Sequence, residues 1–221
     1  MDLGSELRDQ THIDLGPGFR APPPSGQFHG SLRFESSFDV NQNRLSLIPV
    51  SLFKDVLYSE DKTLILDVGC NSGELTVAFY KHLQTSMTEE EKSRKAVHIL
   101  GFDLDETLIQ RANETNPFPN NIAFIHLDIT SDAEALQDYL KQHGCSRFHL
   151  CLCLAVTMWV HLNHGDSGLL KLLFDLSSCS QHLLLEAQPW KCYRSAARRL
   201  RKLGIQTGPP ELVHNTSRFK R

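Results

Sequence analysis

Two histidines and a tryptophan in the C-terminal half of the chain could hold an anion beside an unstacked base. His161 and His164 lie three residues apart in the segment 157–166, together with Trp159. Histidines at this spacing could share a helix face and bind a metal ion, but no third ligand of suitable spacing accompanies them. The segment better suits an anionic group and a base stacked on tryptophan. In the alternative, Trp159 is a core residue and the histidines face solvent.

A second group of residues with similar chemistry follows in the segment 188–202, where aromatic and basic residues alternate. Trp190 and Tyr193 could stack on bases. Arg194 and Arg198 are four residues apart, which aligns them along one flank of a helix. A charged stripe is often only a solvated helix face, but the aromatic neighbours favour a track for the phosphates and bases of RNA.

A glycine-bearing turn between an apolar run and a helical pattern could hold a nucleotide-like cofactor. Residues 64–68 predict a strand, and Gly69 and Gly73 would let the backbone approach a ligand closely. Asn71 tolerates a left-handed conformation. A dinucleotide site would need G-x-G-x-x-G, because a pyrophosphate presses against bare backbone. Four-residue glycine spacing after Asp67 instead favours S-adenosylmethionine, which carries no phosphate, although such a loop can also be only a tight connection.

Acidic residues end the next two predicted strands, where the same cofactor would extend. Residues 96–103 end in Asp103, which could accept hydrogen bonds from both ribose hydroxyls. Residues 122–127 are followed by Asp128 and Ile129, an acid for the exocyclic amine of adenine and an apolar side chain for its ring face. Asp128 could equally cap the following turn.

These residues need a scaffold, and the hydrophobic pattern predicts one of alternating strands and helices. The alternation is typical of an α/β, Rossmann-like fold with a mostly parallel sheet and helices on both faces. The charged segment 86–95 is predicted to be a surface loop. Strands are predicted over 64–68, 96–103, 122–127, 148–155 and 181–186. Helices are predicted over 74–83, 107–115, 133–143 and 168–177, and a last, basic helix is predicted to run to about 203 after the segment 188–194.

Length and composition limit the class of protein further. The 221 residues suit one domain, predicted over 31–204, between a Gly- and Pro-rich arm over 1–30 and an irregular basic tail over 205–221. No apolar run approaches the roughly 20 residues of a membrane span, and the N-terminus lacks a signal segment, which predicts a soluble, cytoplasmic protein without membrane contact. The 6 cysteines lack zinc-site spacing, so we expect buried reduced thiols and no metal.

Three motifs resemble those of the bicoid-interacting-protein-three type RNA 5′-phosphate methyltransferases. They are LDVGCNSG at 66–73, TMWVHLNHGD at 157–166 and QPWKCY at 188–193, and the similarity runs from about Arg44 to Gly204. Within this family the chain most resembles the short cytoplasmic type that methylates RNA 5′-monophosphates. The resemblance implies a class I, S-adenosylmethionine-dependent methyltransferase acting on small RNAs such as tRNA-His and precursor microRNAs.

The resemblance also implies roles for individual residues. It predicts that one set contacts the cofactor, a second holds the terminal phosphate, and a third binds the bases and backbone of the RNA. No strong general base is needed, since the phosphate is already anionic near neutral pH. The cofactor set is Arg44, Asp67, Gly69, Asn71, Gly73, Asp103, Asp128, Ile129 and Leu154; the phosphate set is His161, His164 and Lys191; the RNA set is Trp159, Trp190, Tyr193, Arg194 and Arg198.

The chain departs from the family pattern at two places. Ala187 stands where the family favours proline, a change expected to have a small effect. After Gly204 the family continues with a helix and an antiparallel pair of strands, which residues 205–221 with their paired prolines are too few to form. We therefore expect a monomer with an exposed sheet edge that could bind a partner. Three alternatives stay open: a non-catalytic relative that binds RNA or a partner, an enzyme that caps the γ-phosphate of a small nuclear RNA, and a small-molecule methyltransferase.

Overall fold

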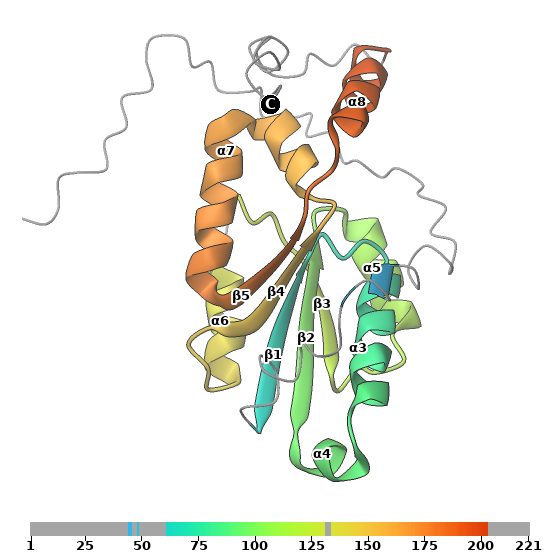
Figure 1. Cartoon of the computed structure of the whole chain (residues 1–221), viewed down its shortest axis with the longest axis vertical. Coiled ribbons are helices and arrows are strands. Elements are labelled where there is room, and N and C mark those ends of the chain that lie inside the picture. Colours follow the sequence, from blue (N-terminus) through green and yellow to red (C-terminus); the bar gives the residue numbers. More distant parts are fainter. Residues whose placement is uncertain (1–43, 46–47, 49–60, 131–133, 203–221) are drawn as a thin grey trace, which may run out of the picture.

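A parallel β-sheet forms the centre of the molecule in the computed structural model, which describes residues 44–45, 48, 61–130 and 134–202 (Figure 1). Within these residues the sheet has five strands in the order β3-β2-β1-β4-β5. The strand order reverses at β1, which pairs with β2 on one side and β4 on the other. In open α/β sheets ligands bind at this reversal, outside the carboxyl ends of the strands. The strands are β1 (Lys62–Val68), β2 (Ala96–Asp103), β3 (Ile122–His126), β4 (Phe148–Leu154) and β5 (Ser180–Glu186).

Helices cover both faces of the sheet. Helices α3 (Glu74–Ser86) and α5 (Glu106–Thr115) pack on one face, and α6 (Glu134–Gln142) and α7 (Thr157–Cys179) pack on the other. A short helix, α4 (Glu89–Arg94), lies near the amino ends of the strands, while α8 (Trp190–Lys202) stands beyond their carboxyl ends (Figure 1).

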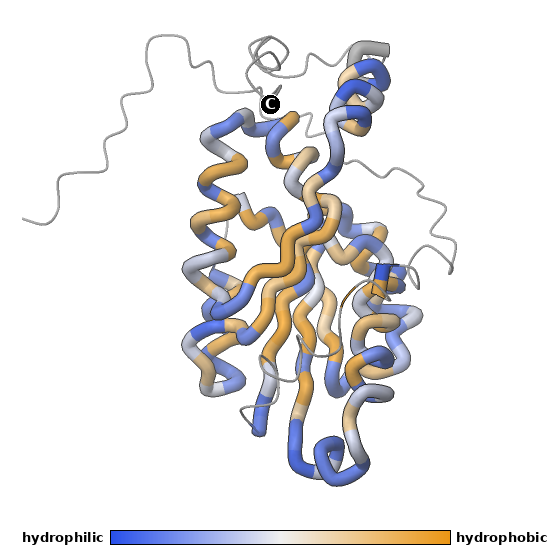
Figure 2. Tube along the Cα trace, in the orientation of Figure 1, coloured by the Kyte–Doolittle hydropathy of each residue, from blue (hydrophilic) through white to orange (hydrophobic). Residues whose placement is uncertain are grey.

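Alternate residues of the central strand supply the two halves of the core. Ile65 packs with Phe79 of α3 on one face of the sheet, while Leu64 packs with Leu140 of α6 and Leu176 of α7 on the other. All five side chains are at most 1% exposed. Burial of each contributes roughly 1.5–3 kcal/mol. The strands are accordingly hydrophobic along most of their length (Figure 2), and this rigid core fixes the positions of the strand ends.

The predicted α/β, Rossmann-like fold is confirmed, with helices on both faces of a parallel sheet. One local prediction is wrong: the segment 86–95 contains helix α4 rather than only a loop. Its N-terminus carries a capping box, in which the Glu91 amide donates to Thr88 Oγ1 (3.2 Å) and the Thr88 amide donates to Glu91 Oε2 (2.8 Å). This T-x-x-E pattern was present in the sequence and is a known helix-start signal.

Helix α7 begins eleven residues earlier than the predicted start at 168, because the segment 157–166 is itself helical. Gly165, with φ 67° and ψ −168°, separates its two parts. The sequence pattern indicated only the second part, where Leu172 and Leu176 are buried at a four-residue spacing. The kink at Gly165 explains why the two parts do not share one hydrophobic stripe.

Several other sequence-based expectations can be placed. Leu45, which precedes β1, is buried in the core. The 6 cysteines are free thiols, and four of them are buried as expected, whereas Cys145 and Cys192 are only partly buried. No helix among the described residues is both long and apolar enough to span a membrane. The segments 1–30 and 205–221 lie outside the described residues, so the domain limits stay predictions.

Candidate active site

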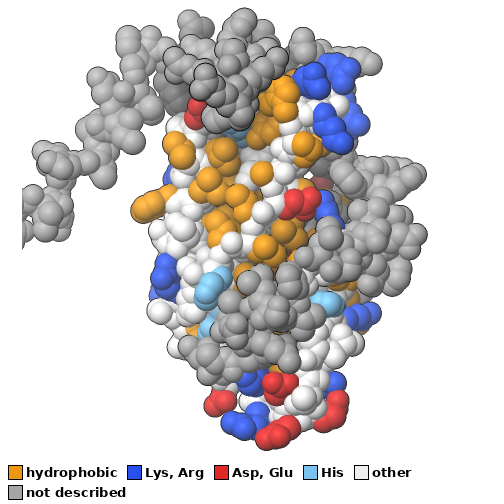
Figure 3. All heavy atoms as spheres, in the orientation of Figure 1, with side chains coloured by type: hydrophobic (Ala, Val, Ile, Leu, Met, Phe, Trp, Pro, Cys, Tyr) orange, Lys and Arg blue, Asp and Glu red, His pale blue; other side chains and the backbone are white. Residues whose placement is uncertain are grey.

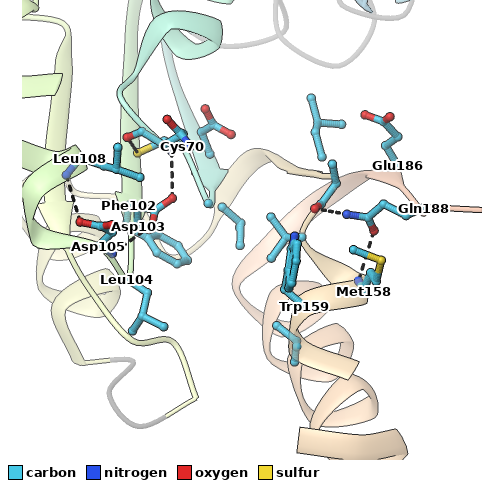
Figure 4. A pocket seen from close by; sticks show the side chains of 18 of the residues that line it. Cys70, Phe102, Asp103, Leu104, Asp105, Leu108, Met158, Trp159, Glu186 and Gln188 are labelled. Atoms are coloured by element: carbon cyan, nitrogen blue, oxygen red, sulfur yellow. Dashed lines mark hydrogen bonds between the residues drawn. The ribbon is translucent and has the colours of Figure 1, made fainter. Parts of the chain in front are cut away.

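A pocket of about 1090 Å³ opens at the carboxyl ends of the strands, where the strand order reverses. Sites for single small molecules usually enclose about 300–1,000 Å³, so this pocket has room for a cofactor and a further group. Two walls face each other across it (Figure 4). Asp103 and Leu108 lie on the wall formed by β2 and α5, and Trp159 and Gln188 lie on the opposite wall.

The loop after β1 is tied to the neighbouring strand through its backbone amides. The amides of Gly69 and Cys70 both donate to the Phe102 carbonyl at 2.9 Å. The Asn71 amide donates to Asp103 Oδ2, also at 2.9 Å. The loop is therefore held in place by the end of β2.

The last two amides of this loop bond within the loop itself. The Ser72 amide donates to Asn71 Oδ1 (2.7 Å), and the Gly73 amide donates to the Cys70 carbonyl (3.0 Å). All five amides from Gly69 to Gly73 thus have protein acceptors. A pyrophosphate needs such amides as donors. The loop is consequently unsuited to a dinucleotide and suited to a cofactor without phosphate.

Three loop residues adopt left-handed backbone conformations, including Asn71, for which the sequence indicated one. Gly69 has φ 70°, and a Cβ there would lie 2.5 Å from Val156 Cγ2; Gly73 has φ 77°, and a Cβ there would lie 2.5 Å from Phe124 Cζ. Asn71 has φ 54°. Gly69 and Asn71 line the pocket, whereas Gly73 does not. Gly73 is needed for the turn and for packing on the Phe124 ring.

The two predicted strand-end acids both line the pocket, and each also holds its own turn. Asp103 Oδ1 accepts the Asp105 amide (3.0 Å), while its Oδ2 accepts the loop amide described above. Because each carboxylate oxygen has two lone pairs, Asp103 can still accept two ribose hydroxyls. Asp128 Oδ1 accepts from the Thr130 amide (2.9 Å) and hydroxyl (2.6 Å). Asp128 therefore caps its turn and also faces the pocket.

Asp67 lies beneath the loop and is only 3% exposed. Its Oδ2 accepts a 2.6 Å hydrogen bond from the Thr76 hydroxyl, which anchors the first turn of α3. Burial raises the pKa of Asp67 to about 6, and the Asp103 charge adds to this effect while the Thr76 hydrogen bond opposes it. Asp67 thus adds negative charge below the loop at neutral pH.

Acidic side chains dominate this side of the pocket, which we call the acidic wall. It repels phosphate and attracts the sulfonium and amino groups of S-adenosylmethionine, while the apolar side chains beside it suit an adenine ring. The residues therefore fit this cofactor. The acidic wall comprises Asp67, Glu74, Asp103, Asp105 and Asp128, together with the apolar Phe102, Leu104, Leu127 and Ile129.

On the opposite side, we call the surface formed by Trp159 and His164 of α7 and by Lys191, Ser195 and Arg199 of α8 the basic wall. Gln188 and Glu186, which is paired with Arg44, line the pocket beside it. The three α8 residues recur every four positions and therefore share one helix face. Basic side chains gather over α8 (Figure 3). The sequence analysis missed Arg199, although its spacing of eight residues from Lys191 was a usable signal.

The two arginines predicted to follow the RNA backbone lie on another flank of α8. Arg194 and Arg198 are exposed and do not line the pocket. Arg198 Nε donates to the Arg194 carbonyl (3.2 Å), and one of its terminal nitrogens donates to Ser195 Oγ (3.4 Å). Contact with an RNA that extends beyond the pocket remains a prediction for both.

His161, predicted to hold the phosphate, does not line the pocket either. Its Nε2 lies 2.6 Å from Asp166 Oδ1, and its Nδ1 lies 3.1 Å from the Tyr193 hydroxyl. Tyr193 stacks on Trp190 with ring centroids 5.5 Å apart. His161, Trp190 and Tyr193 therefore form a cluster behind the basic wall, from which Trp190 remains 40% exposed.

Gln188 joins the end of β5 to the start of α7, a role that the sequence analysis did not assign. Its Nε2 donates to the Ala155 carbonyl, and its Oε1 accepts from the Met158 amide (3.2 Å) and the Thr157 hydroxyl (3.3 Å) (Figure 4). Ala155 has φ 62°, a conformation that costs about 1–2 kcal/mol outside glycine. Gln188 thus stabilises a strained turn at the pocket.

Two further predicted cofactor residues lie at the pocket near β4 and β5. Arg44 forms a 3.3 Å ion pair with Glu186 at the end of β5 and lines the pocket on this side. Leu154 lines the pocket at the end of β4. Among the residues that the structure describes, no group of three or more His, Cys, Asp or Glu side chains could hold a metal ion.

Comparisons with known proteins agree with these features. The family described as Bicoid-interacting protein 3 (Bin3) matches residues 148–212, which contain the whole basic wall. A Danio rerio protein named pre-miRNA 5′-monophosphate methyltransferase is 55% identical over 188 residues, covering 82% of this chain and 74% of that protein. The chain belongs to the Bin3 family.

Two more relatives in the Bin3 family have similar names. A Xenopus laevis pre-miRNA 5′-monophosphate methyltransferase is 44% identical over 205 residues, covering 88% of this chain and 76% of that protein. A Homo sapiens RNA 5′-monophosphate methyltransferase is 43% identical over 195 residues, covering 84% of this chain and 66% of that protein. The chain thus spans about two thirds to three quarters of the length of these relatives.

Proposed function

We propose that this Bin3-family chain transfers a methyl group from S-adenosylmethionine to an oxygen of the 5′-terminal phosphate of an RNA 5′-monophosphate. The names of its relatives support this reaction. The observation that carries the proposal is that one pocket has an acidic wall and a basic wall facing each other. A cationic cofactor and an anionic acceptor would each lie against the wall of opposite charge, with the reacting atoms between them.

The basic wall binds and orients the acceptor in this proposal. When bound, the cofactor supplies an electrophilic methyl group. Lys191, Arg199 and His164 hold the terminal phosphate, and Trp159 stacks on the first base. The phosphate is anionic near neutral pH, so no side chain has to remove a proton first. Positioning then supplies most of the rate acceleration, as it can for well-oriented intramolecular reactions.

The acidic wall orients the cofactor. Asp103 accepts its ribose hydroxyls, and Asp128 and Ile129 contact its adenine. Asn71 contacts the cofactor from the loop after β1. Arg44 and Leu154 close the side of the pocket near β4 and β5. Asp67 acts from below by holding the loop through α3.

The proposal also covers the kind of RNA, the oligomeric state and the location in the cell. The RNA is a precursor microRNA, as in the names of two relatives, or another small RNA with a 5′-monophosphate, such as tRNA-His. The enzyme acts as a monomer. It acts in the cytoplasm.

The test is transfer of labelled methyl to a short hairpin RNA with a 5′-monophosphate, compared with 5′-hydroxyl and 5′-triphosphate versions, with circular dichroism to verify folding. Label confined to the monophosphate RNA is the expected result. Preferential labelling of the triphosphate RNA would indicate a γ-phosphate capping enzyme instead. RNA binding by the folded protein without any transfer would indicate a non-catalytic relative.

A further inference from the structure

A continuous chain of hydrogen bonds lies behind the basic wall and joins α7 to α8. Asp166 Oδ1 lies 2.6 Å from His161 Nε2, and His161 Nδ1 lies 3.1 Å from the Tyr193 hydroxyl. With a neutral ring, Nε2–H donates to the carboxylate and Nδ1 accepts from the hydroxyl. Burial, assisted by the Asp166 charge, raises the pKa of Tyr193 and so keeps its hydroxyl protonated as a donor.

The kink in α7 makes this chain possible. Asp166 follows His161 by five residues, and side chains at that spacing point to different sides of a regular helix. Gly165 interrupts the helix with φ 67° and ψ −168°, which brings the carboxylate back to the imidazole. The His161 side chain is 14% exposed while that of Asp166 is 79% exposed, so the carboxylate covers the ring from the solvent side.

Tyr193 connects His161 to α8, the helix that carries most of the basic wall. It lies two residues after Lys191 on α8, and its ring meets the His161 ring edge-on with centroids 5.6 Å apart. It also stacks on the Trp190 ring of α8. Each residue of a helix is rotated about 100° from the last. Fixing Tyr193 against α7 therefore fixes which side of α8 carries Lys191 and Arg199 into the pocket.

We propose that Asp166, His161 and Tyr193 are positioning residues that set the rotation of α8 and thereby the affinity for the RNA 5′-phosphate, without contacting the phosphate. The proposal rests on the function proposed above. It replaces the sequence-based expectation that His161 itself holds the phosphate.

Steady-state kinetics of Tyr193→Phe and Asp166→Asn test this role, because both changes keep the size of the side chain. We expect the KM for monophosphate RNA to rise about tenfold in each, the change expected from one hydrogen bond, with kcat and the cofactor KM nearly unchanged. Matched controls are Tyr139→Phe on α6 and Asp175→Asn on α7, which should behave as the wild type. An unchanged RNA KM in both variants, with a large loss only in His161→Ala, would overturn the proposal in favour of direct contact.

Fluorescence quenching tests the same role without any activity. The chain has 2 tryptophans, so a Trp159→Phe background reports on Trp190 alone. We expect the acrylamide quenching constant of Trp190 to rise about twofold in Tyr193→Phe and Asp166→Asn, because Trp190 is 40% exposed when α8 is docked. Unchanged quenching would overturn the positioning role. If quenching rises but the wild type transfers no methyl to RNA, the positioning role stands and only the proposed function fails.

Discussion

The acidic wall comes from three adjacent strand ends, whereas the basic wall comes from two helices that meet beyond the sheet. Strand ends are fixed by the ladder between strands and by the buried core. Helix α8 has little burial: among its side chains whose burial is described, only that of Ala196 is buried. Its position depends on side-chain contacts such as that between His161 and Tyr193. The acidic wall is thus held by the backbone and the basic wall by side chains, so the basic wall should be easier to disturb.

The largest predicted effect is loss of the basic charges. Lys191→Ala combined with Arg199→Ala should lower kcat/KM for monophosphate RNA about 10³-fold, since each lost charge contact to a phosphate costs about 2 kcal/mol or more. Cofactor affinity, measured by calorimetry, should not change. The control pair Arg194→Ala and Arg198→Ala removes the same two charges from the other flank, and its loss should be near tenfold and vanish at high salt. Equal losses in both pairs would contradict the assignment of the helix face.

Asp67 of the acidic wall should make the free energy of unfolding of the protein depend on pH. Its pKa is raised from 3.8 to about 6 on folding, so between these values the folded state binds more protons than the unfolded state. This contribution is fully present below pH 3.8 and is lost as pH rises through 6, which amounts to about 3 kcal/mol by pH 7. Urea unfolding should therefore show that Asp67→Asn gains stability relative to the wild type as pH rises from 4.5 to 7.5. A constant difference between the two proteins would exclude a raised pKa.

Replacement of Asp103, the proposed acceptor for the ribose hydroxyls, should weaken cofactor binding alone. Asp103→Asn keeps an oxygen for the Asn71 amide but removes the charge, so we expect about tenfold weaker binding of S-adenosylmethionine by calorimetry. Binding of monophosphate RNA, measured separately, should stay as in the wild type. Asp138→Asn, on the exposed side of α6, is the control for the change in net charge. If RNA binding fell along with cofactor binding, the two walls would not be independent.

The smallest effect is expected for two glycines that both have a positive φ. Gly165 has φ 67° and Gly144 has φ 68°, and a Cβ at either would meet nothing within 4 Å. Substitution by alanine should therefore cost stability at both sites through backbone strain, about 1 kcal/mol at Gly144. The cost should be larger, up to about 3 kcal/mol, at Gly165, because its ψ of −168° lies in a region essentially confined to glycine. Thermal unfolding measures both. Only Gly165→Ala should also raise the KM for RNA, by several-fold, because it disturbs the position of Asp166. A similar rise in Gly144→Ala would show that general destabilisation is the cause.

The sequence by itself determined the parallel sheet, the glycine-bearing loop and the acids at the strand ends. These features depend on residues close together in the chain. Alternating strands and helices place successive strand ends at one edge of the sheet, so Asp67, Asp103 and Asp128 had to meet there. The roles of Gly69 and Asn71 in the turn likewise follow from local conformation.

Only the tertiary structure decided the composition of the basic wall. A helix sequence offers several flanks, and the choice of Arg199 over Arg198 depends on how α8 is rotated against α7. The sequence predicted that His161 holds the phosphate. In the structure His161 contacts Asp166 and Tyr193 and lies behind the basic wall, outside the pocket. Those contacts join residues up to 32 positions apart, and no pattern within either helix encodes such pairings.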